Sequence, residues 1–306
     1  MYNMDKLYET VSGRGHVCVG LDTAVDYIPL AGRASSGAET LLAYNRAIID
    51  ATTDIAACFK VQIAYYEALG RAGLETYAKT LAYIREKKCL VIADIKRGDI
   101  ADTARYYARA HFEGDFEADF VTLSPYMGMD SIEPWIAHAE TKGKGAFVLM
   151  RTSNKGMRDF QYLEIKETNR PAADRLCHAV GDKLAALAGQ YCGSHGYGAF
   201  GAVVGADPKS GDEREEAAAL RRRYSNLFFL IPGYGAQGGA AEDAALLLRG
   251  GNGGVVNASR SILKAWTVKA EKAGQQETVT NDFAAEAARE AAINMRDAIK
   301  KAIAGQ

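Results

Sequence analysis

Two aspartates and one lysine are closely spaced in the segment 91–103, which reads VIADIKRGDIADT. Asp94 and Lys96 end an apolar stretch that is typical of a strand, and they share one face of it because strand side chains alternate. Asp99 follows after a short turn, so the pattern Asp-x-Lys-x-x-Asp gathers two carboxylates and one ammonium at the carboxyl end of a strand. A fixed ammonium of this kind can stabilise negative charge that develops on a reacting atom. The alternative is a structural salt bridge, because charges at a core-facing position are costly unless they are paired.

Other polar residues occupy further apolar, strand-like stretches. Asp22 ends the stretch HVCVGLD, Lys60 lies inside CFKVQI, and Ser153 follows AFVLM in the loop RTSN. The glycine-rich segment PGYGAQGG and the segment NASRSI, which contains Arg260, follow two later stretches. Glycines let backbone N–H groups approach phosphate oxygens, and an arginine adds a bidentate contact, so these two segments together predict a phosphate site. Taken singly, each has an ordinary alternative: a paired buried lysine, a turn serine, a flexible turn and a surface arginine.

The elements that must position these residues are eight strand-like runs separated by helical segments. The alternation indicates parallel βαβ units, and the number of strands favours a closed (β/α)8 TIM barrel over an open doubly wound sheet. No GxGxxG motif follows the first strand to indicate a dinucleotide fold. In such barrels active sites lie at the carboxyl ends of the strands, with phosphate sites after the seventh and eighth. The expected strands are 16–22, 58–63, 90–96, 120–124, 146–150, 200–204, 227–231 and 254–256.

We expect one α/β domain over residues 1–306, with helices at 5–11, 39–56, 65–87 and 282–303, and another that begins at about residue 100. The sequence SGDE at 210–213 resembles a capping box that opens a helix ending in three arginines. Two segments are longer than a barrel requires: the fifth crossover, 152–198, and a polar insertion before the last helix, 265–280. We interpret both as peripheral additions.

Composition excludes several classes of function. A net charge of −1 and an isoelectric point near 6.5 do not favour a nucleic-acid or anionic membrane surface. We expect no membrane span and no signal peptide, and therefore a soluble cytoplasmic protein. The five cysteines form no CxxC pair, so we expect free, buried thiols in a reducing compartment. The five histidines have no metal-ligand spacing, so we expect no metal.

The motifs VGLD, CFKVQ, ADIKRGDI, PGYGAQGG and NASRSI together resemble those of the orotidine 5'-phosphate decarboxylase family, over nearly the whole barrel. The similarity is greatest to the longer bacterial branch of that family. It implies decarboxylation of orotidine 5'-phosphate (OMP) to UMP and CO2, the last step of de novo pyrimidine synthesis, with no metal and no cofactor.

The same resemblance assigns roles to the charged cluster. Lys96 would donate a proton to carbon 6 of the ring, and Asp94 would lie against the departing carboxylate. Asp99 would hold Lys96 in place from the neighbouring subunit, and Thr103 would reach the site from that subunit too. This arrangement implies a homodimer with shared sites, although Thr103 read alone is an ordinary early-helix residue.

The remaining substrate contacts also follow from the resemblance. Asp22 and Lys60 would contact the ribose, with Lys60 also in the charge network. Ser153 would bond the pyrimidine, and Gln237 and Arg260 would hold the phosphate.

Two rival functions remain open. Sugar-phosphate lyases that resemble the keto-gulonate-phosphate decarboxylases share the Asp-x-Lys-x-x-Asp pattern but hold magnesium through an acidic residue on the second strand, where this chain has Lys60. A catalytically silent nucleotide-binding barrel is the rival from another class. It predicts UMP binding without turnover.

Overall fold

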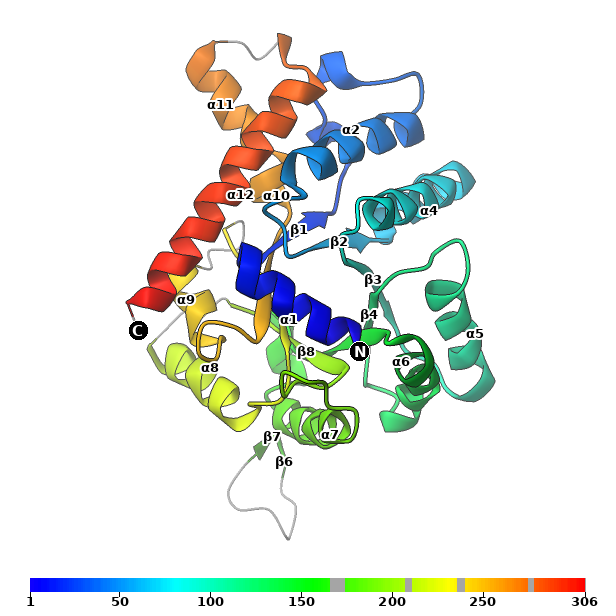
Figure 1. The fold of residues 1–306 in the computed structure, drawn as a ribbon, viewed down its shortest axis with the longest axis vertical. Coiled ribbons are helices and arrows are strands. Elements are labelled where there is room, and N and C mark those ends of the chain that lie inside the picture. The colour runs from blue at the N-terminus through cyan, green and yellow to red at the C-terminus, as the bar shows by residue number, and fades with distance from the viewer. Residues whose placement is uncertain (166–173, 207–210, 236–239, 275–277, 306) are drawn as a thin grey trace.

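Eight parallel strands close into a barrel in the computed structural model, which describes residues 1–165, 174–206, 211–235, 240–274 and 278–305 (Figure 1). Around the barrel the order is β1-β10-β9-β8-β5-β4-β3-β2, so every predicted strand is present and the predicted (β/α)8 fold is confirmed. The strands are β1 (Val17–Leu21), β2 (Cys58–Gln62), β3 (Val91–Arg97), β4 (Phe120–Leu123), β5 (Gly145–Arg151), β8 (Phe200–Val204), β9 (Phe229–Ile231) and β10 (Gly254–Ala258).

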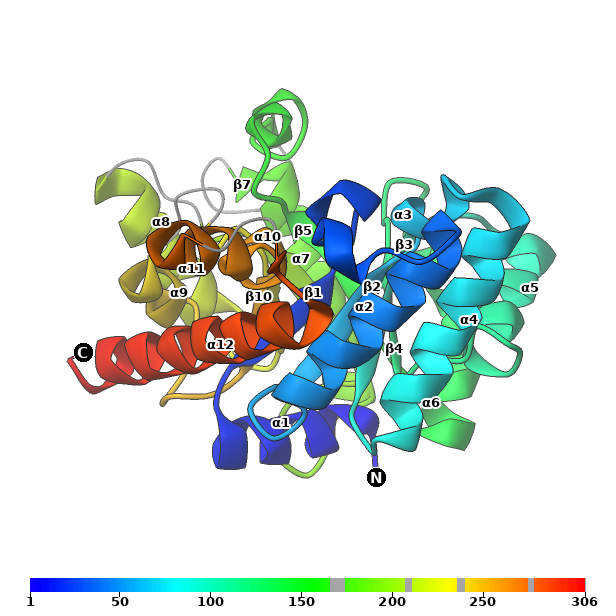
Figure 2. The same cartoon turned by 90° about the horizontal axis from the view of Figure 1, so that it is seen from above.

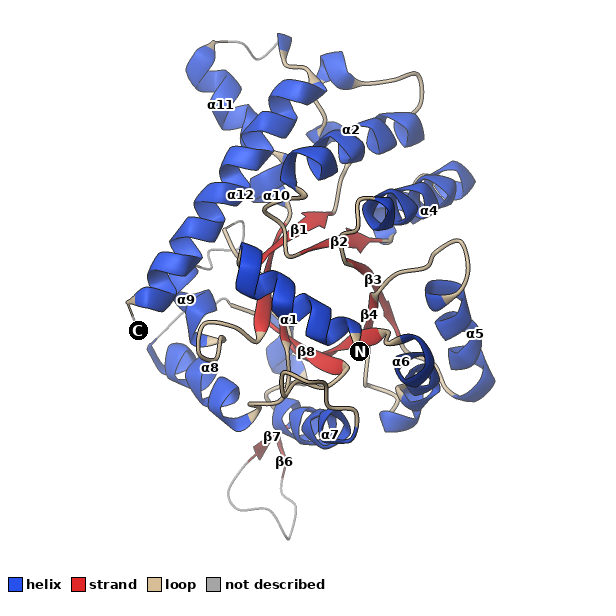
Figure 3. Cartoon of the chain, viewed as in Figure 1, coloured by secondary structure: helices blue, strands red, loops and turns tan. Residues whose placement is uncertain are grey.

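Helices surround the ring of strands (Figure 3). The α-helices are α1 (Asn3–Arg14), α2 (Gly37–Thr52), α3 (Ala64–Glu67), α4 (Gly70–Glu86), α5 (Ala101–Phe112), α6 (Ile136–Lys142), α7 (Leu176–Gln190), α8 (Gly211–Arg223), α9 (Ala241–Leu246), α10 (Arg260–Leu263), α11 (Ala265–Ala273) and α12 (Asn281–Ala304). Short 3-10 turns are η1 (Val25–Tyr27), η2 (Leu30–Gly32), η3 (Met129–Ser131), η4 (Glu133–Trp135) and η5 (Lys155–Asp159).

The strands are mostly apolar, with polar residues toward their carboxyl ends, because both of their faces are buried. All residues of β1, β8 and β10 are buried, as expected of a parallel sheet covered by helices. On β3, Ile92 faces a cluster inside the barrel with Phe120 and Phe147, while Val91 and Ala93 face the surrounding helices. Because side chains alternate along a strand, Asp94, two positions after Ile92, also faces the barrel interior.

One end of the barrel is closed by α1. Met4, Leu7 and Val11 of this helix belong to the same buried cluster as the interior residues of the strands. Figure 2 shows α1 at the end of the barrel opposite β7 (Asp174–Arg175), which pairs with β6 (Glu164–Ile165). The opposite end of the barrel, at the carboxyl ends of the strands, is therefore the open one.

Two details of the predicted elements differ from the structure. The single helix expected at 65–87 is divided into α3 and α4, because Gly70 adopts a φ of +64° that an L-residue in a continuous helix would not take. The insertion 265–280 contains the helix α11, which packs beside α12 with Ala270 fully buried.

The helix α8 begins at Gly211, as the capping motif predicts, but Ser210 itself lies outside the described residues.

The cysteines are free, and four of them are buried as predicted, but Cys192 is exposed. Among the described residues, no helix combines the length and the apolar character that crossing a bilayer requires.

Candidate active site

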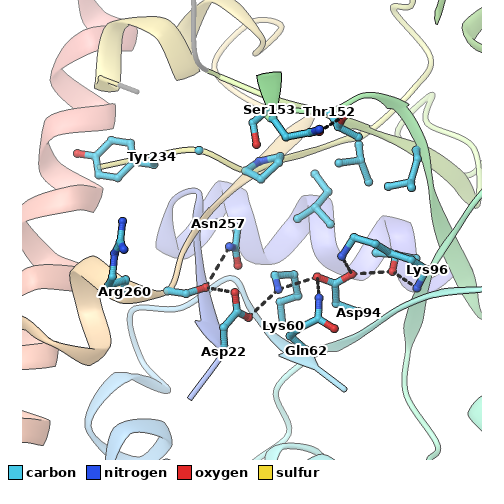
Figure 4. A pocket seen from close by; sticks show the side chains of 18 of the residues that line it. Asp22, Lys60, Gln62, Asp94, Lys96, Thr152, Ser153, Tyr234, Asn257 and Arg260 are labelled. Carbon is cyan, nitrogen blue, oxygen red and sulfur yellow. Dashed lines mark hydrogen bonds and ion pairs between the residues drawn. The ribbon is translucent and has the colours of Figure 1, made fainter. Parts of the chain in front are cut away.

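A cavity of about 640 Å³ opens at the carboxyl ends of the strands, and its size falls within the range of small-molecule sites. Its walls come from the carboxyl ends of all eight barrel strands or the segments after them, and the apolar side chains of Leu149, Val203 and Leu230 also line it. Figure 4 shows its labelled side chains, with Arg260 and Tyr234 at one end and Asp94 and Lys96 at the other. The cavity is therefore elongated, with a cationic side chain at each end.

Four charged side chains of alternating sign connect the first three strands. Lys60 Nζ donates to Asp22 Oδ1 at 2.9 Å and to Asp94 Oδ2 at 2.8 Å, and Lys96 Nζ donates to Asp94 Oδ1 at 2.6 Å. Lys60 is buried, whereas the side chain of Lys96 is 48% exposed and lines the cavity. The buried lysine is thus held between two carboxylates, and the accessible one extends into the site.

Asp94 is the centre of this network. Burial alone would raise its pKa, but the ammonium groups of Lys60 and Lys96 hold that pKa well below its usual range. Burial alone would likewise lower the pKa of Lys60, and the carboxylates of Asp22 and Asp94 instead raise it above its ordinary value. Asp94 and Lys60 are therefore both charged at neutral pH, and each charge depends on its neighbours.

Polar side chains that the sequence patterns did not identify complete the coordination of Asp94. Gln62 Nε2 donates to Oδ2 at 3.0 Å, and Thr122 Oγ1 donates to Oδ1 at 2.8 Å. With the two lysines, each carboxylate oxygen accepts two hydrogen bonds. Gln62 could have been found from its spacing, since it shares the inward face of β2 with Lys60.

Asp22 is held from the other side by β10. Ser259 Oγ donates to Asp22 Oδ2 at 3.0 Å, and Asn257 Nδ2 donates to Ser259 Oγ at 3.3 Å. This approach requires Gly20, because a Cβ at that position would lie 1.9 Å from Ser259 Oγ. The glycine of the VGLD motif therefore makes room for the side chains that fix Asp22.

The end of the cavity around Arg260 corresponds to the predicted phosphate site. Pro232, Gly233 and Tyr234 line it together with Arg260, which starts α10 directly after β10. Gly233 has a φ of +106°, a backbone conformation that favours glycine. Gln237, the other predicted phosphate ligand, lies outside the described residues.

Ser153 lines the cavity between Thr152 and Asn154, in the loop that follows β5. Gln161 holds this loop: its Oε1 accepts from the Thr152 backbone N–H at 2.8 Å, and its Nε2 donates to Thr152 Oγ1 at 2.9 Å. Gln161 itself lines the cavity. The interpretation of the fifth crossover as peripheral is therefore wrong for its first part, because Gln161 lines the cavity. No sequence signal marks Gln161.

Asp99 and Thr103 do not line the cavity of their own chain. Asp99 Oδ1 accepts from the backbone N–H of Ile100 at 2.9 Å, and Thr103 is exposed on the first turn of α5. Among the described residues, Asp94 is the carboxylate that pairs with Lys96. The Asp-x-Lys-x-x-Asp pattern is thus only partly assembled within one chain.

The fold and this cavity define a (β/α)8-barrel protein with a charged site at the carboxyl face and Arg260 at one end of that site. The chain belongs to the orotidine 5'-phosphate decarboxylase / HUMPS family, whose model matches residues 15–276, and the predicted family is therefore confirmed.

Relatives of nearly the same length carry the same name. The chain is 53% identical over 301 residues to the orotidine 5'-phosphate decarboxylase of Clostridium perfringens (strain SM101 / Type A), which covers 98% of both chains. It is 51% identical over 300 residues to that of Clostridium kluyveri, covering 97% of both. These names denote carboxy-lyases.

Solved structures agree with this assignment. The crystal structure of a putative orotidine 5'-phosphate decarboxylase from Streptomyces avermitilis aligns with a TM-score of 0.77 at 30% identity, over 98% of this chain and 95% of that one. The OMP decarboxylase of Leishmania donovani aligns with a TM-score of 0.72 at 29% identity, over 99% of each chain.

Proposed function

We propose that this chain decarboxylates orotidine 5'-phosphate to UMP and CO2, with Lys96 as the proton donor and without a metal or cofactor. The observation that carries the proposal is the position of the Lys96–Asp94 pair at one end of the cavity and Arg260 at the other (Figure 4). A nucleotide whose phosphate lies against Arg260 would extend its base toward Lys96. Asp22 and Lys60 would then be near the ribose, and Ser153 near the pyrimidine.

The proposed reaction needs a group that stabilises a carbanion. The bond between C6 and the carboxylate carbon breaks, its electron pair stays on C6, and CO2 leaves. A proton from Lys96 Nζ bonds to C6 to give UMP, and solvent returns a proton to the lysine. The ammonium of Lys96, already fixed by Asp94, stabilises the charge at C6 without reorganisation.

Repulsion between Asp94 and the substrate carboxylate is not enough by itself. At ~4 Å and an effective dielectric constant near 20 it amounts to about 4 kcal/mol. That corresponds to roughly three powers of ten in rate, which is small beside the acceleration that slow uncatalysed reactions require. Lys96 must therefore contribute directly, and binding of the remote phosphate must help to hold the reacting end in place.

The direct test is an ultraviolet assay of OMP consumption by the purified protein with EDTA present. We expect full turnover to UMP. Loss of turnover with EDTA and its return with Mg²⁺ would favour the metal-dependent sugar-phosphate lyases instead. UMP binding without OMP turnover would indicate a silent nucleotide-binding barrel.

We further propose that the protein is a homodimer in which Asp99 and Thr103 complete the site of the neighbouring subunit. Two observations support this. Neither side chain reaches the cavity of its own chain, and large apolar side chains are exposed on or beside α5 and elsewhere on the surface. The exposed apolar residues are Ile100 and Tyr106 on or beside α5, Tyr126 and Met127 after β4, and Phe160 in the fifth crossover.

Sharing of sites predicts complementation between inactive variants. Lys96→Ala and Asp99→Ala should each have very low activity alone. When they are co-expressed with different tags, a mixed dimer holds one site with a native Lys96 and a native partner Asp99. Random pairing should therefore restore roughly a quarter of wild-type activity. Purified mixed dimers that remain inactive, or an Asp99→Ala homodimer of near-wild-type activity, would contradict a shared site.

Removal of Arg260 should act mainly on binding. We expect Arg260→Ala to raise KM by about 10- to 100-fold with a smaller effect on kcat, because a charge-assisted contact to a phosphate remote from the bond that breaks is made in the ground state as well. Initial rates over a range of OMP concentrations measure both constants. Arg222→Ala, which removes an exposed arginine paired with Glu215 on α8, is the control. An unchanged KM in Arg260→Ala would remove this residue from the phosphate site.

A further inference from the structure

Thr122 lies beside an irregularity in β3 that no sequence motif marks. The pairing of β3 with β4 shifts its register between Ala93 and Arg97, the interval that contains Asp94 and Lys96. Within it, the backbone N–H groups of Ile95 and Lys96 both donate to Thr122 Oγ1, each at 3.0 Å. The threonine hydroxyl thus replaces the backbone acceptor that a regular ladder would provide.

The hydroxyl hydrogen of Thr122 can donate to only one of the neighbouring acceptors. A hydroxyl group has one hydrogen and two acceptor lone pairs, and here two N–H donors occupy the lone pairs. The hydrogen is left for Asp94 Oδ1, which Thr122 contacts at 2.8 Å. The same oxygen accepts from Lys96 Nζ at 2.6 Å. Thr122 therefore contacts the backbone of Lys96 and the carboxylate that holds its ammonium.

The backbone of Lys96 needs such support. Its φ is +45°, in the left-handed region that residues with a Cβ rarely adopt. Strained conformations of this kind persist only where the surrounding structure determines them. Thr122 is 1% exposed, and its hydroxyl is directed at this segment by the buried strand β4.

We propose that Thr122 is a positioning residue for the decarboxylation: its hydroxyl holds the β3 irregularity and Asp94 so that the Lys96 ammonium points into the cavity. This inference rests on the proposed function, since it assigns to Thr122 an effect on the step that Lys96 performs. Thr122 acts through Lys96 and Asp94, so its removal should affect the chemical step more than binding of the nucleotide.

The test compares Thr122→Val, Thr122→Ala and Thr122→Ser with the wild-type enzyme. Valine keeps the shape of threonine but has no hydroxyl, alanine removes the bulk as well, and serine keeps the hydroxyl. We expect kcat to fall by about 30- to 100-fold in the valine and alanine variants, with KM and the Kd of UMP within about threefold of wild type. Serine should restore kcat to within about threefold. Thr52→Val is the matched control, because Thr52 is also buried and its hydroxyl donates to the Ile48 carbonyl in α2.

The outcomes separate this inference from the proposed function. A wild-type protein that does not consume OMP contradicts the proposed function itself. With an active wild type, a kcat within twofold of wild type in Thr122→Val overturns only the role of Thr122. If the valine variant does not fold, the serine variant decides: a kcat as low as that of Thr122→Ala shows that packing, not the hydroxyl, matters, and also overturns the proposal.

Discussion

Replacing Lys96 by alanine is expected to lower kcat by at least about 10⁴-fold, because in the proposed reaction this side chain both donates the proton and stabilises the developing negative charge. A positioned proton donor contributes about 10²- to 10⁴-fold, and a preorganised charge beside a developing anion about 10²- to 10³-fold. Alanine removes both. Single-turnover and steady-state measurements of OMP consumption give the change in rate.

Binding of UMP should distinguish a lost reaction from a lost site. The end of the cavity at Arg260, where we propose that the phosphate binds, is remote from the substitution (Figure 4), so the Kd of UMP measured by calorimetry should change by less than about tenfold. Lys87→Ala is the control, since this lysine pairs with Asp50 and does not line the cavity. A Lys96→Ala variant with turnover within tenfold of wild type would remove Lys96 from the mechanism.

The second large effect is expected for Asp94→Asn, which should reduce both stability and rate. Each oxygen of Asp94 accepts two hydrogen bonds, but an amide nitrogen accepts none, so one pair of donors would lose its acceptor. Lys60 and Lys96 would also lose their common counter-charge. Breaking a buried ion pair by removing one partner costs about 3–5 kcal/mol, and we expect the free energy of unfolding in urea to fall by that amount.

The rate of Asp94→Asn tests the contribution of repulsion. If the negative charge of Asp94 supplies about 4 kcal/mol against the substrate carboxylate, kcat should fall about 10³-fold. Asp54→Asn is the control: it removes one carboxylate from an exposed pair with Arg289 and should change stability by no more than about 1 kcal/mol. A variant as stable and as fast as wild type would show that the charge of Asp94 matters for neither.

The stability difference should depend on pH in a defined direction. The pKa of Asp94 is lower in the folded protein than in the unfolded chain, so its stabilising effect is complete above the unfolded value of about 3.9 and is lost as pH falls below it. The difference in unfolding free energy between wild type and Asp94→Asn should therefore be constant from about pH 5 to 8 and shrink below about pH 4. Urea titrations across this range measure it.

Much of the site could be predicted from the sequence because a closed barrel places the carboxyl ends of its strands close together. Asp22, Lys60, Asp94, Lys96, Ser153 and Arg260 all line the cavity, although they come from five different strands or the segments after them. Each lies within, ends or follows an apolar run, which is a local signal. Since the carboxyl ends of parallel strands meet at one face of a closed barrel, that signal suffices to bring them together.

Other features depend on contacts that no local pattern contains. Gln161 reaches the cavity because the fifth crossover folds back on the loop after β5. Asp99 is three residues from Lys96 in sequence, yet it accepts from its own helix start and not from that lysine. Sequence spacing alone therefore overstated how completely one chain assembles the charged cluster.

The sequence by itself determined the number and order of the strands, the inward-facing charges and the glycines of the loops, because these follow from side-chain alternation and backbone conformation within a few residues. Only the tertiary structure decided which charge pairs with which, since the register between strands places Lys60 between Asp22 and Asp94. The tertiary structure also decided the orientation of Lys96. The irregular pairing of β3 with β4 lets Thr122 Oγ1 accept hydrogen bonds from the backbone N–H groups of Ile95 and Lys96. This contact depends on a strand more than twenty residues away in sequence.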